Sequence, residues 1–285
     1  MSIFLQKNTI SLHLGDTRYI YHHTQSIMTQ RNPILLSTDT LPGFGLDLIF
    51  KIAQQAGFDG IDLALWRSYD AWHPDYVAEL SEKYKLPILA IQTSLKANAT
   101  ELNRALEIAQ ACWTKKILIN APKYFDTKSY SFLTGNLKSY QDNNPDREFS
   151  IINPDDSSMS YLPFPKYRFR NIGEILKKYK MRFGFDIANM YEDTIQTLVI
   201  GQWKTIIPQI SLVYLADRKK SQDHISPWEW SYNLISILKA LQKHKYTEPF
   251  SIKLKLDKKT LVNNEKVLFQ LEKSIHYIEA HFSTV

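Results

Sequence analysis

The sequence predicts an α/β protein of the (β/α)8 TIM-barrel class. From Pro33 onward, short apolar stretches alternate eight times with amphipathic stretches of helical period, a pattern typical of parallel βαβ units. A length of 285 residues, 44% of them hydrophobic, suits one such domain, whereas an open doubly wound sheet usually has about five or six strands. Neither glycine-rich phosphate-binding motif, G-x-G-x-x-G or G-x-x-x-x-G-K-[ST], occurs in the sequence.

The predicted strands and helices follow one another along the chain from Pro33. The strands are expected at residues 34–38, 60–65, 87–92, 116–120, 148–153, 182–186, 210–216 and 250–256. The helices are expected at residues 47–56, 74–84, 100–112, 128–140, 172–179, 193–205, 228–244 and 262–282. Gly57 is a typical stop for the first helix, and apolar residues three or four apart define the packing face of the last.

The first 32 residues stand apart from this alternation. Residues 9–14 and 17–23 alternate between apolar and polar side chains, and a Gly-Asp pair joins them, which predicts a β-hairpin. We therefore expect an N-terminal β-hairpin extension at residues 1–32 and a barrel at 33–285, forming a single domain overall. The adjacent His22 and His23 would point to opposite faces of their strand, so they are not expected to bind a metal together.

Composition limits the classes of partner. The net charge of +6 is spread along the chain, which disfavours a dedicated nucleic-acid surface and favours small anionic ligands. No apolar stretch reaches the roughly 18 residues of a membrane span, and the N-terminus has no signal-peptide layout, so a cytoplasmic protein without membrane contact is expected. The single cysteine, Cys112, excludes an internal disulfide and is expected to be a small buried hydrophobe.

Several segments carry a family resemblance. Residues 55–63 read Gln-Ala-Gly-Phe-Asp-Gly-Ile-Asp-Leu, and residues 183–189 read Phe-Gly-Phe-Asp-Ile-Ala-Asn. Residues 211–217 read Ser-Leu-Val-Tyr-Leu-Ala-Asp, residues 223–227 read Asp-His-Ile-Ser-Pro, and residues 246–254 read Tyr-Thr-Glu-Pro-Phe-Ser-Ile-Lys-Leu. In order and spacing these segments resemble the xylose-isomerase-like superfamily of sugar isomerases, sugar-phosphate epimerases and AP endonucleases. The resemblance covers about residues 34 to 280 and implies the barrel fold.

The resemblance also implies a divalent metal, held by Glu, Asp, His and Glu from strands five, six, seven and eight. The corresponding positions of this sequence carry Asn153, Asp186, Tyr214 and Lys253. Only the aspartate is retained, and a lysine replaces one carboxylate, so the usual metal site is not expected to form and no cofactor is predicted. One alternative stays open, in which Asp155 or Asp156 rebuilds a metal site with Asp186 and a histidine.

Strand alternation places the replaced residues. If Asp186 points into the barrel, Gly184 does too, and the apolar residues between them face the helices. If Lys253 points inward, Ser251 and Lys255 do as well. Because a buried lysine without a partner is costly, we expect the Lys253 ammonium to take the place of the metal charge and to pair with Asp186. The alternative is a shifted register in which the lysines reach solvent.

Barrel enzymes place their chemistry at the carboxyl ends of the strands and in the loops that follow. The candidate catalytic residues are Asp186, Lys253 and His224. His224 and His73 are the two histidines that follow strands, and each has an ordinary hydrogen-bonding role as its alternative. The candidate substrate-binding residues are Asp62, Trp66, His73, Asn153, Asn189, Tyr214 and Lys255. Trp66, Trp228 and Trp230 could stack against a sugar or base, or simply pack.

The leading interpretation is a barrel related to sugar-phosphate isomerases and epimerases that binds a small polar or phosphorylated ligand at its mouth without a metal. Whether it catalyses a reaction stays open. The expected reaction would be proton transfer next to a carbonyl, with Lys253 supplying positive charge and Asp186, Asp62 or His224 as the base.

Two alternatives to this interpretation stay open. The chain could be a non-catalytic binding or scaffold barrel, with the hairpin mediating association, including association with a second copy. It could also be a DNA-repair endonuclease of the AP-endonuclease type. The endonuclease ranks last, because the strand ends lack the histidines and glutamates of a multi-metal site.

Overall fold

The computed structural model describes most of the chain beyond residue 30. The described residues are 31–94, 96, 98–123, 125–155, 177, 180–190, 203–219, 222–228 and 234–282. The hairpin predicted at residues 1–32 therefore lies outside the described residues apart from its last two positions. Most of the helices predicted at 172–179 and 193–205 lie outside them as well. No described helix has the length and apolar character needed to cross a membrane.

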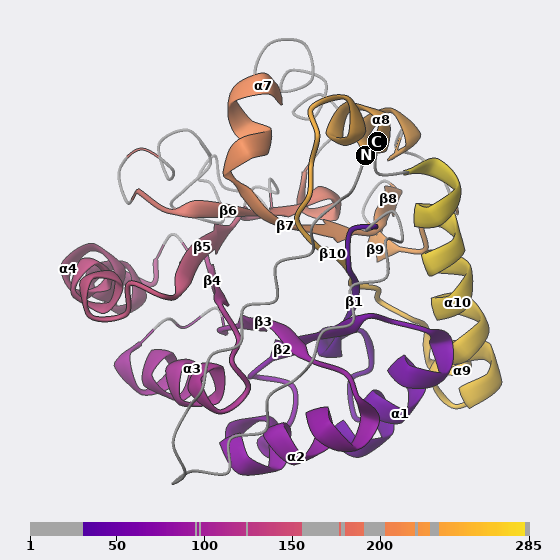
Figure 1. Ribbon diagram of the computed structural model, residues 1–285, viewed down its shortest axis with the longest axis horizontal. Coiled ribbons are helices and arrows are strands. Elements are labelled where there is room, and N and C mark those ends of the chain that lie inside the picture. The colour runs from indigo at the N-terminus through magenta and orange to yellow at the C-terminus, as the bar shows by residue number, and fades with distance from the viewer. Residues whose placement is uncertain are drawn as a thin grey trace, which may run out of the picture. The chain divides into compact units, whose positions relative to one another are not determined.

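Eight parallel strands close into a barrel, which confirms the predicted fold class (Figure 1). Their order around the barrel is β1-β10-β7-β6-β5-β4-β3-β2. The strands are β1 (Ile34–Ser37), β2 (Gly60–Ala64), β3 (Ile88–Gln92), β4 (Lys116–Asn120), β5 (Glu148–Ile152), β6 (Arg182–Asp186), β7 (Ile210–Leu215) and β10 (Phe250–Ile252).

Helices surround the barrel on the outside, as Figure 1 shows. The described α-helices are α1 (Leu46–Ala56), α2 (Pro74–Tyr84), α3 (Ala99–Ala111), α4 (Thr127–Asn143), α7 (Trp203–Ile206), α8 (Leu234–Lys243), α9 (Lys258–Leu261) and α10 (Asn264–His281). Short 3-10 helices follow two strands at the mouth, η1 (Thr38–Thr40) after β1 and η3 (Ile187–Asn189) after β6, while η2 (Tyr69–Trp72) lies in the β2–α2 connection and η4 (Ile207–Gln209) precedes β7.

Alternation along the strands separates two buried apolar clusters. The larger cluster lies between the strands and the helices and includes Phe183, Phe185 and Ile252. The smaller cluster consists of residues one position away on the strands, which point into the barrel. Its members are Leu35, Ala90, Leu118, Ile152, Leu212 and Tyr214. This separation agrees with the strand alternation expected from the sequence.

The last strand is shorter than predicted, because β10 ends at Ile252 instead of continuing to residue 256. Beyond it, the backbone N–H of Leu254 donates to Thr40 Oγ1 at 3.1 Å. The N–H of Lys255 donates to the carbonyl of His224 at 2.8 Å. Because these N–H groups bond to neighbouring loops and not to an adjacent strand, the segment after Ile252 keeps the alternating Lys-Leu sequence but is not part of the sheet.

Two further elements were not predicted. An antiparallel hairpin of β8 (Asp217–Lys219) and β9 (Gln222–Ile225) follows β7 and brings His224 to the barrel mouth. The short helix α9 lies just before the last predicted helix, which corresponds to α10. Asn263 starts α10 by accepting a hydrogen bond from Lys266 N at 3.1 Å.

Gly60 starts β2 where no side chain fits. A Cβ at this position would lie 2.7 Å from the carbonyl oxygen of Pro87, which itself accepts a hydrogen bond from Ile61 N. We expect Gly60→Ala to lower the free energy of unfolding by about 1–3 kcal/mol, because the backbone of two strands must separate. The matched control is Gly135→Ala in α4, where a Cβ meets nothing within 4 Å. There the higher helix propensity of alanine should stabilise by about 0.5–1 kcal/mol. Urea unfolding measures the free energy of unfolding of both variants. Equal changes in Gly60→Ala and Gly135→Ala would contradict the packing argument.

Candidate functional site

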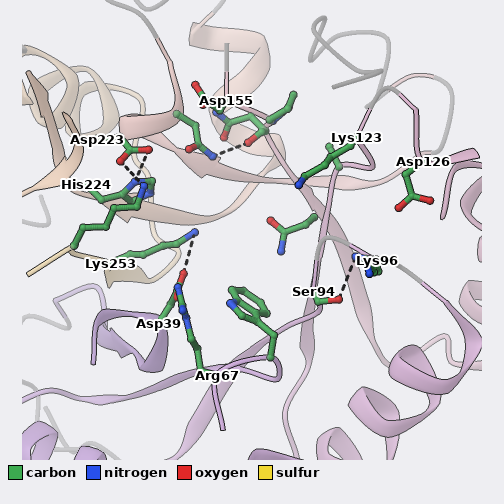
Figure 2. Close-up of a pocket in the computed structure, with 17 residues that line it drawn as sticks. Asp39, Arg67, Ser94, Lys96, Lys123, Asp126, Asp155, Asp223, His224 and Lys253 are labelled. Carbon is green, nitrogen blue, oxygen red and sulfur yellow. Dashed lines mark hydrogen bonds and ion pairs between the residues drawn. The ribbon is translucent and has the colours of Figure 1, made fainter. Parts of the chain in front are cut away.

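A cavity of about 500 Å³ opens at the carboxyl ends of the barrel strands (Figure 2). Its lining side chains come from strand ends and from the segments that follow them. They are Asp39, Trp66, Arg67, Ser94, Lys96, Asn120, Ala121, Lys123, Asp126, Asn153, Pro154, Asp155, Asn189, Asp223, His224, Lys253 and Lys255. This volume lies within the range of small-molecule sites, about 300–1,000 Å³.

A buried carboxylate, which does not itself line the cavity, pairs with two side chains that do. Asp186 is the last residue of β6 and is fully buried. Its Oδ2 atom lies 3.0 Å from His224 Nε2 and 3.2 Å from Lys253 Nζ. Both partners are nearly buried, with exposed side-chain fractions of 5% for His224 and 12% for Lys253. The pairing expected between Lys253 and Asp186 is therefore present, and His224 joins it.

The protonation states follow from these contacts. Burial raises the pKa of Asp186, but the charges of His224 and Lys253 outweigh burial and hold that pKa at about 2. Burial lowers the pKa of Lys253, and Asp186 more than reverses this, so the pKa of Lys253 is raised. The pKa of His224 is raised for the same reason, against the effect of its burial. These contacts therefore favour an ionised Asp186 beside an ammonium and an imidazolium, and Asp39 Oδ2 lies 3.9 Å from Lys253 Nζ as a further carboxylate.

Asp223 supports the imidazolium from its other side. Its Oδ2 atom lies 3.6 Å from His224 Nδ1, and its Oδ1 atom forms an ion pair with Lys255 Nζ. Burial raises the pKa of Asp223, but the neighbouring His224 ring and Lys255 ammonium lower it well below its usual range. Each ring nitrogen of His224 thus faces an ionised carboxylate, which suits a ring that carries both protons.

The metal ion implied by the family resemblance does not fit these residues. The Lys253 ammonium and the His224 ring both contact Asp186 Oδ2, so the cation positions beside this oxygen are already filled. Both amide atoms of Asn153 are engaged, since Nδ2 donates to Asp186 O at 2.9 Å and Oδ1 accepts from Asp186 N at 2.6 Å. Among the described residues, no group of three or more His, Cys, Asp or Glu side chains is arranged to hold a metal.

The alternative of a rebuilt metal site is not supported where it falls on described residues. Asp155 Oδ1 pairs with Arg218 NH1 at 3.2 Å, so its carboxylate already has a cationic partner. Asp156, the other candidate, lies outside the described residues.

A second polar layer lies below the cavity, inside the barrel. Asp62 Oδ2 accepts hydrogen bonds from Gln92 Nε2 at 2.5 Å and from Ser251 Oγ at 2.8 Å, and Gln92 Nε2 also reaches Ser37 Oγ at 3.0 Å. Tyr214 is fully buried, and its ring lies 4.9 Å from Lys253 Nζ. Asp62 and Tyr214 were predicted to bind substrate, but neither lines the cavity. Both precede the ends of their strands, so they belong to the barrel interior.

Asp62 makes stability depend on pH. Burial raises the pKa of its carboxyl from 3.8 to about 7, although Ser251, Lys253 and Gln92 oppose the rise. Between about pH 4 and pH 7, the folded state keeps a proton that the unfolded chain has released, so the free energy of unfolding falls as pH rises. Asp62→Asn cannot ionise and keeps an acceptor oxygen. From about pH 5 to pH 8, we expect the free energy of unfolding of the wild type to fall by roughly 1–3 kcal/mol relative to that of this variant. Urea unfolding at both pH values measures this, and parallel pH profiles would refute it.

The remaining predicted binding residues divide into two groups. Trp66, Asn153 and Asn189 line the cavity, and their roles as ligand contacts remain predictions. His73 does not line it, because it precedes the first residue of α2 and packs edge-on against Tyr69 with ring centroids 4.9 Å apart.

Lys255 lines the cavity but does not point into the barrel. Its side chain is 62% exposed and pairs with Asp223, since strand alternation ends with β10 at Ile252. Of the two further tryptophans, Trp228 packs under Lys273, whose Nζ lies 4.3 Å from the indole centroid. Trp230 lies outside the described residues.

Several cavity residues were missed by the sequence analysis. Asp39 lies in η1 directly after β1, and Arg67 follows β2. Lys96 and Lys123 come from the segments after β3 and β4, and Asp223 comes from the hairpin. The rule that barrel chemistry follows the strands could have indicated Asp39, whereas the other positions depend on loop paths that the sequence pattern does not show.

Solved structures with the same architecture were found by comparison. A xylose isomerase domain protein from Alicyclobacillus acidocaldarius aligns with a TM-score of 0.62 and 12% identity, over 88% of this chain and 99% of that chain. The chain has the fold of the xylose-isomerase-like barrels. No protein-family model and no curated protein matches the sequence.

Two further solved structures align with this chain over a similar share of its length. The IOLI protein, solved with a bound zinc atom, aligns with a TM-score of 0.66 and 15% identity, over 88% of this chain and 100% of that chain. The 3-keto-D-glucoside 4-epimerase from E. coli aligns with a TM-score of 0.62 and 10% identity, over 88% of this chain and 100% of that chain. At these identities the comparisons establish the fold alone.

Proposed function

We propose that this chain binds a small anionic polyol, such as a sugar phosphate, in the barrel mouth and uses Lys253 and His224 where other barrels of this fold use a metal. The observation that carries the proposal is the pairing of both cations with the buried carboxylate of Asp186. The cavity lining and Asp186 together carry six cations, counting a protonated His224, against five carboxylates, and this excess favours an anionic or strongly polarised ligand oxygen.

The far side of the cavity supplies further cations. Figure 2 shows Lys96 and Lys123 across the cavity from His224 and Lys253. Arg67 is already paired with Asp39. Neither Lys96 nor Lys123 forms an ion pair with a carboxylate in the part of the chain that the structure describes, so both suit a phosphate group.

The middle of the cavity suits hydroxyl groups. Asn189 Nδ2 donates to Asn153 O at 3.0 Å, and Asn120 Nδ2 donates to Thr93 O at 2.6 Å. These bonds fix both amides in place, and each keeps a side-chain carbonyl that can accept from a sugar hydroxyl. The Trp66 indole adds a flat apolar surface against which a sugar ring can stack.

Binding is better supported than proton transfer. Lys253 and His224 could stabilise the negative oxygen that develops when a proton leaves the carbon next to a carbonyl. A base must take that proton, however. Asp186, with its pKa held at about 2, is a weak base, and His224 is favoured in its protonated form. Asp62 lies outside the cavity. The residues first considered as bases therefore do not suit that role in the free protein.

Isothermal titration calorimetry with fructose 6-phosphate and with fructose tests the binding proposal. We expect fructose 6-phosphate to bind in the presence of EDTA. Unphosphorylated fructose should bind far more weakly. Lys253→Met should weaken the binding of fructose 6-phosphate roughly 10- to 100-fold, because it removes a charge-assisted hydrogen bond to the ligand. Lys138→Met, on the exposed surface of α4, is the matched control and should leave binding unchanged. Equal affinity for the two sugars, or binding that requires a divalent metal, would refute the proposal.

Deuterium incorporation tests the proton-transfer candidate. Fructose 6-phosphate is incubated with the protein in D2O, and the loss of the proton signal at C1 is followed by NMR. Exchange that disappears in Lys253→Met supports proton transfer at this site, whereas bound ligand without exchange assigns the cavity to binding alone.

A further inference from the structure

A second cavity of about 430 Å³ lies beside the first at the barrel mouth. It is formed by β9, by the segment that follows β10, and by residues of α9 and α10. Its lining residues are Gln222, Asp223, His224, Ile225, Ser226, Leu254, Lys255, Leu256, Asp257, Thr260 and Gln270. Three of these residues also line the first cavity, so the two spaces share a wall.

The shared wall is thin and consists of Asp223, His224 and Lys255. It is held by the hydrogen bond from Lys255 N to His224 O at 2.8 Å and by the ion pair between the side chains of Lys255 and Asp223. His224 has a φ of 55°, and this left-handed conformation places its carbonyl on Lys255 while its ring reaches Asp186. The Lys255 side chain is 62% exposed, so this part of the wall faces solvent, and a ligand that reaches both cavities would cross there.

The second cavity carries neutral hydrogen-bonding groups. Ser226 Oγ donates to Gln270 Oε1 at 3.0 Å, which fixes the amide and leaves its Nε2 protons available as donors. Thr260 Oγ1 donates to Asp257 Oδ2 at 3.2 Å, so its proton is engaged and its oxygen can accept from a ligand hydroxyl. Leu256 contributes apolar surface beside these groups.

The two cavities differ in net charge. In the second cavity the carboxylates of Asp223 and Asp257 balance the ammonium of Lys255 and the imidazolium of His224, so no excess positive charge attracts a second anionic group there. An amide donor, hydroxyl and carboxylate acceptors and an apolar surface together suit a neutral ring with several hydroxyl groups.

We propose that the second cavity is a subsite for a neutral, hydroxyl-rich unit joined to the anionic unit in the first cavity, so that the ligand is a phosphorylated disaccharide or glycoside instead of a single sugar phosphate. This inference rests on the proposed function of the first cavity. Gln270 is its main specificity residue, because its amide is fixed by Ser226 and it lines the second cavity but not the first.

Calorimetric affinities for glucose 6-phosphate, trehalose 6-phosphate and sucrose 6-phosphate test the inference. We expect at least one of the two disaccharide phosphates to bind the wild type about tenfold or more tightly than glucose 6-phosphate, since two or three extra hydrogen bonds form. Gln270→Leu should remove this advantage and leave the affinity for glucose 6-phosphate unchanged. Thr260→Val provides a second variant with the same expectation. Lys266→Ala, on α10 outside the lining, is the control and should change neither affinity.

The possible failures are distinguishable. If glucose 6-phosphate binds and neither disaccharide phosphate binds more tightly, the second subsite is refuted and the proposed function stands. If Gln270→Leu and Thr260→Val weaken all three ligands equally, the residues act through the fold and the subsite is again refuted. If none of the three phosphates binds the wild type, the proposed function fails and the inference fails with it.

Discussion

Lys253→Glu is expected to turn the cation cluster into a divalent-metal site. The new carboxylate would lie beside Asp186, whose Oδ2 atom is 3.2 Å from the present ammonium, and near Asp39, at 3.9 Å. His224 would add an imidazole nitrogen. Carboxylate and imidazole ligands of this kind bind Mn²⁺ and Zn²⁺. We expect the variant to take up about one metal ion per chain and to gain thermal stability with added metal, by about 2.7 kcal/mol at a metal concentration 100 times the dissociation constant.

Lys253→Gln is the matched control for this change. It removes the same positive charge without adding a carboxylate, so it should neither retain metal through dialysis nor respond to metal in thermal unfolding. A wild-type protein that gains stability with metal as much as Lys253→Glu does would show that Lys253 does not exclude the ion. A Lys253→Glu variant that folds but neither retains metal nor gains thermal stability with it would show that the cluster geometry is wrong.

Asp186→Asn is expected to be the most destabilising single change at the site. Asp186 is fully buried and is the shared partner of Lys253 and His224. An asparagine leaves both cations near a neutral amide inside the barrel, and breaking a buried ion pair in this way costs about 3–5 kcal/mol. The free energy of unfolding from urea titration at neutral pH measures the loss.

The control for Asp186→Asn is the same substitution at a surface ion pair. Asp142 pairs with Lys138 on α4 at 3.0 Å, and their side chains are 61% and 83% exposed. Asp142→Asn should change the free energy of unfolding by less than about 0.5–1 kcal/mol. Similar losses at both positions would mean that the cluster contributes no more than a solvated ion pair.

Most of the barrel could be predicted because its strands are apolar on both sides. β4 and β6 have the predicted bounds, since each is a short buried run whose limits coincide with a change in sequence pattern. The hairpin of β8 and β9 was missed, because its sequence is mostly charged and has no apolar alternation. Its position depends on contacts with distant residues, such as the hydrogen bond from Lys255 N to His224 O.

The site was predictable to the extent that strand alternation controls it. Asp186 and Lys253 could be predicted to lie together, because strand alternation points both side chains into the barrel. They do so although β7 lies between β6 and β10. His224 could be identified as a candidate but not placed, since its ring reaches Asp186 only through the positive φ of its backbone. Lys96 and Lys123 lie in loops whose paths are set by tertiary contacts, so no local pattern indicates them.

The metal content of the wild-type protein tests the central claim most directly. The protein is dialysed against Mn²⁺, Zn²⁺ or Mg²⁺, then against buffer, and its metal is measured by inductively coupled plasma mass spectrometry. If Lys253 and His224 occupy Asp186 as cationic partners, the wild type should retain far less than one ion per chain in every case. Retention of about one ion per chain, lost in Asp186→Asn, would contradict the account and return the site to metal-dependent chemistry.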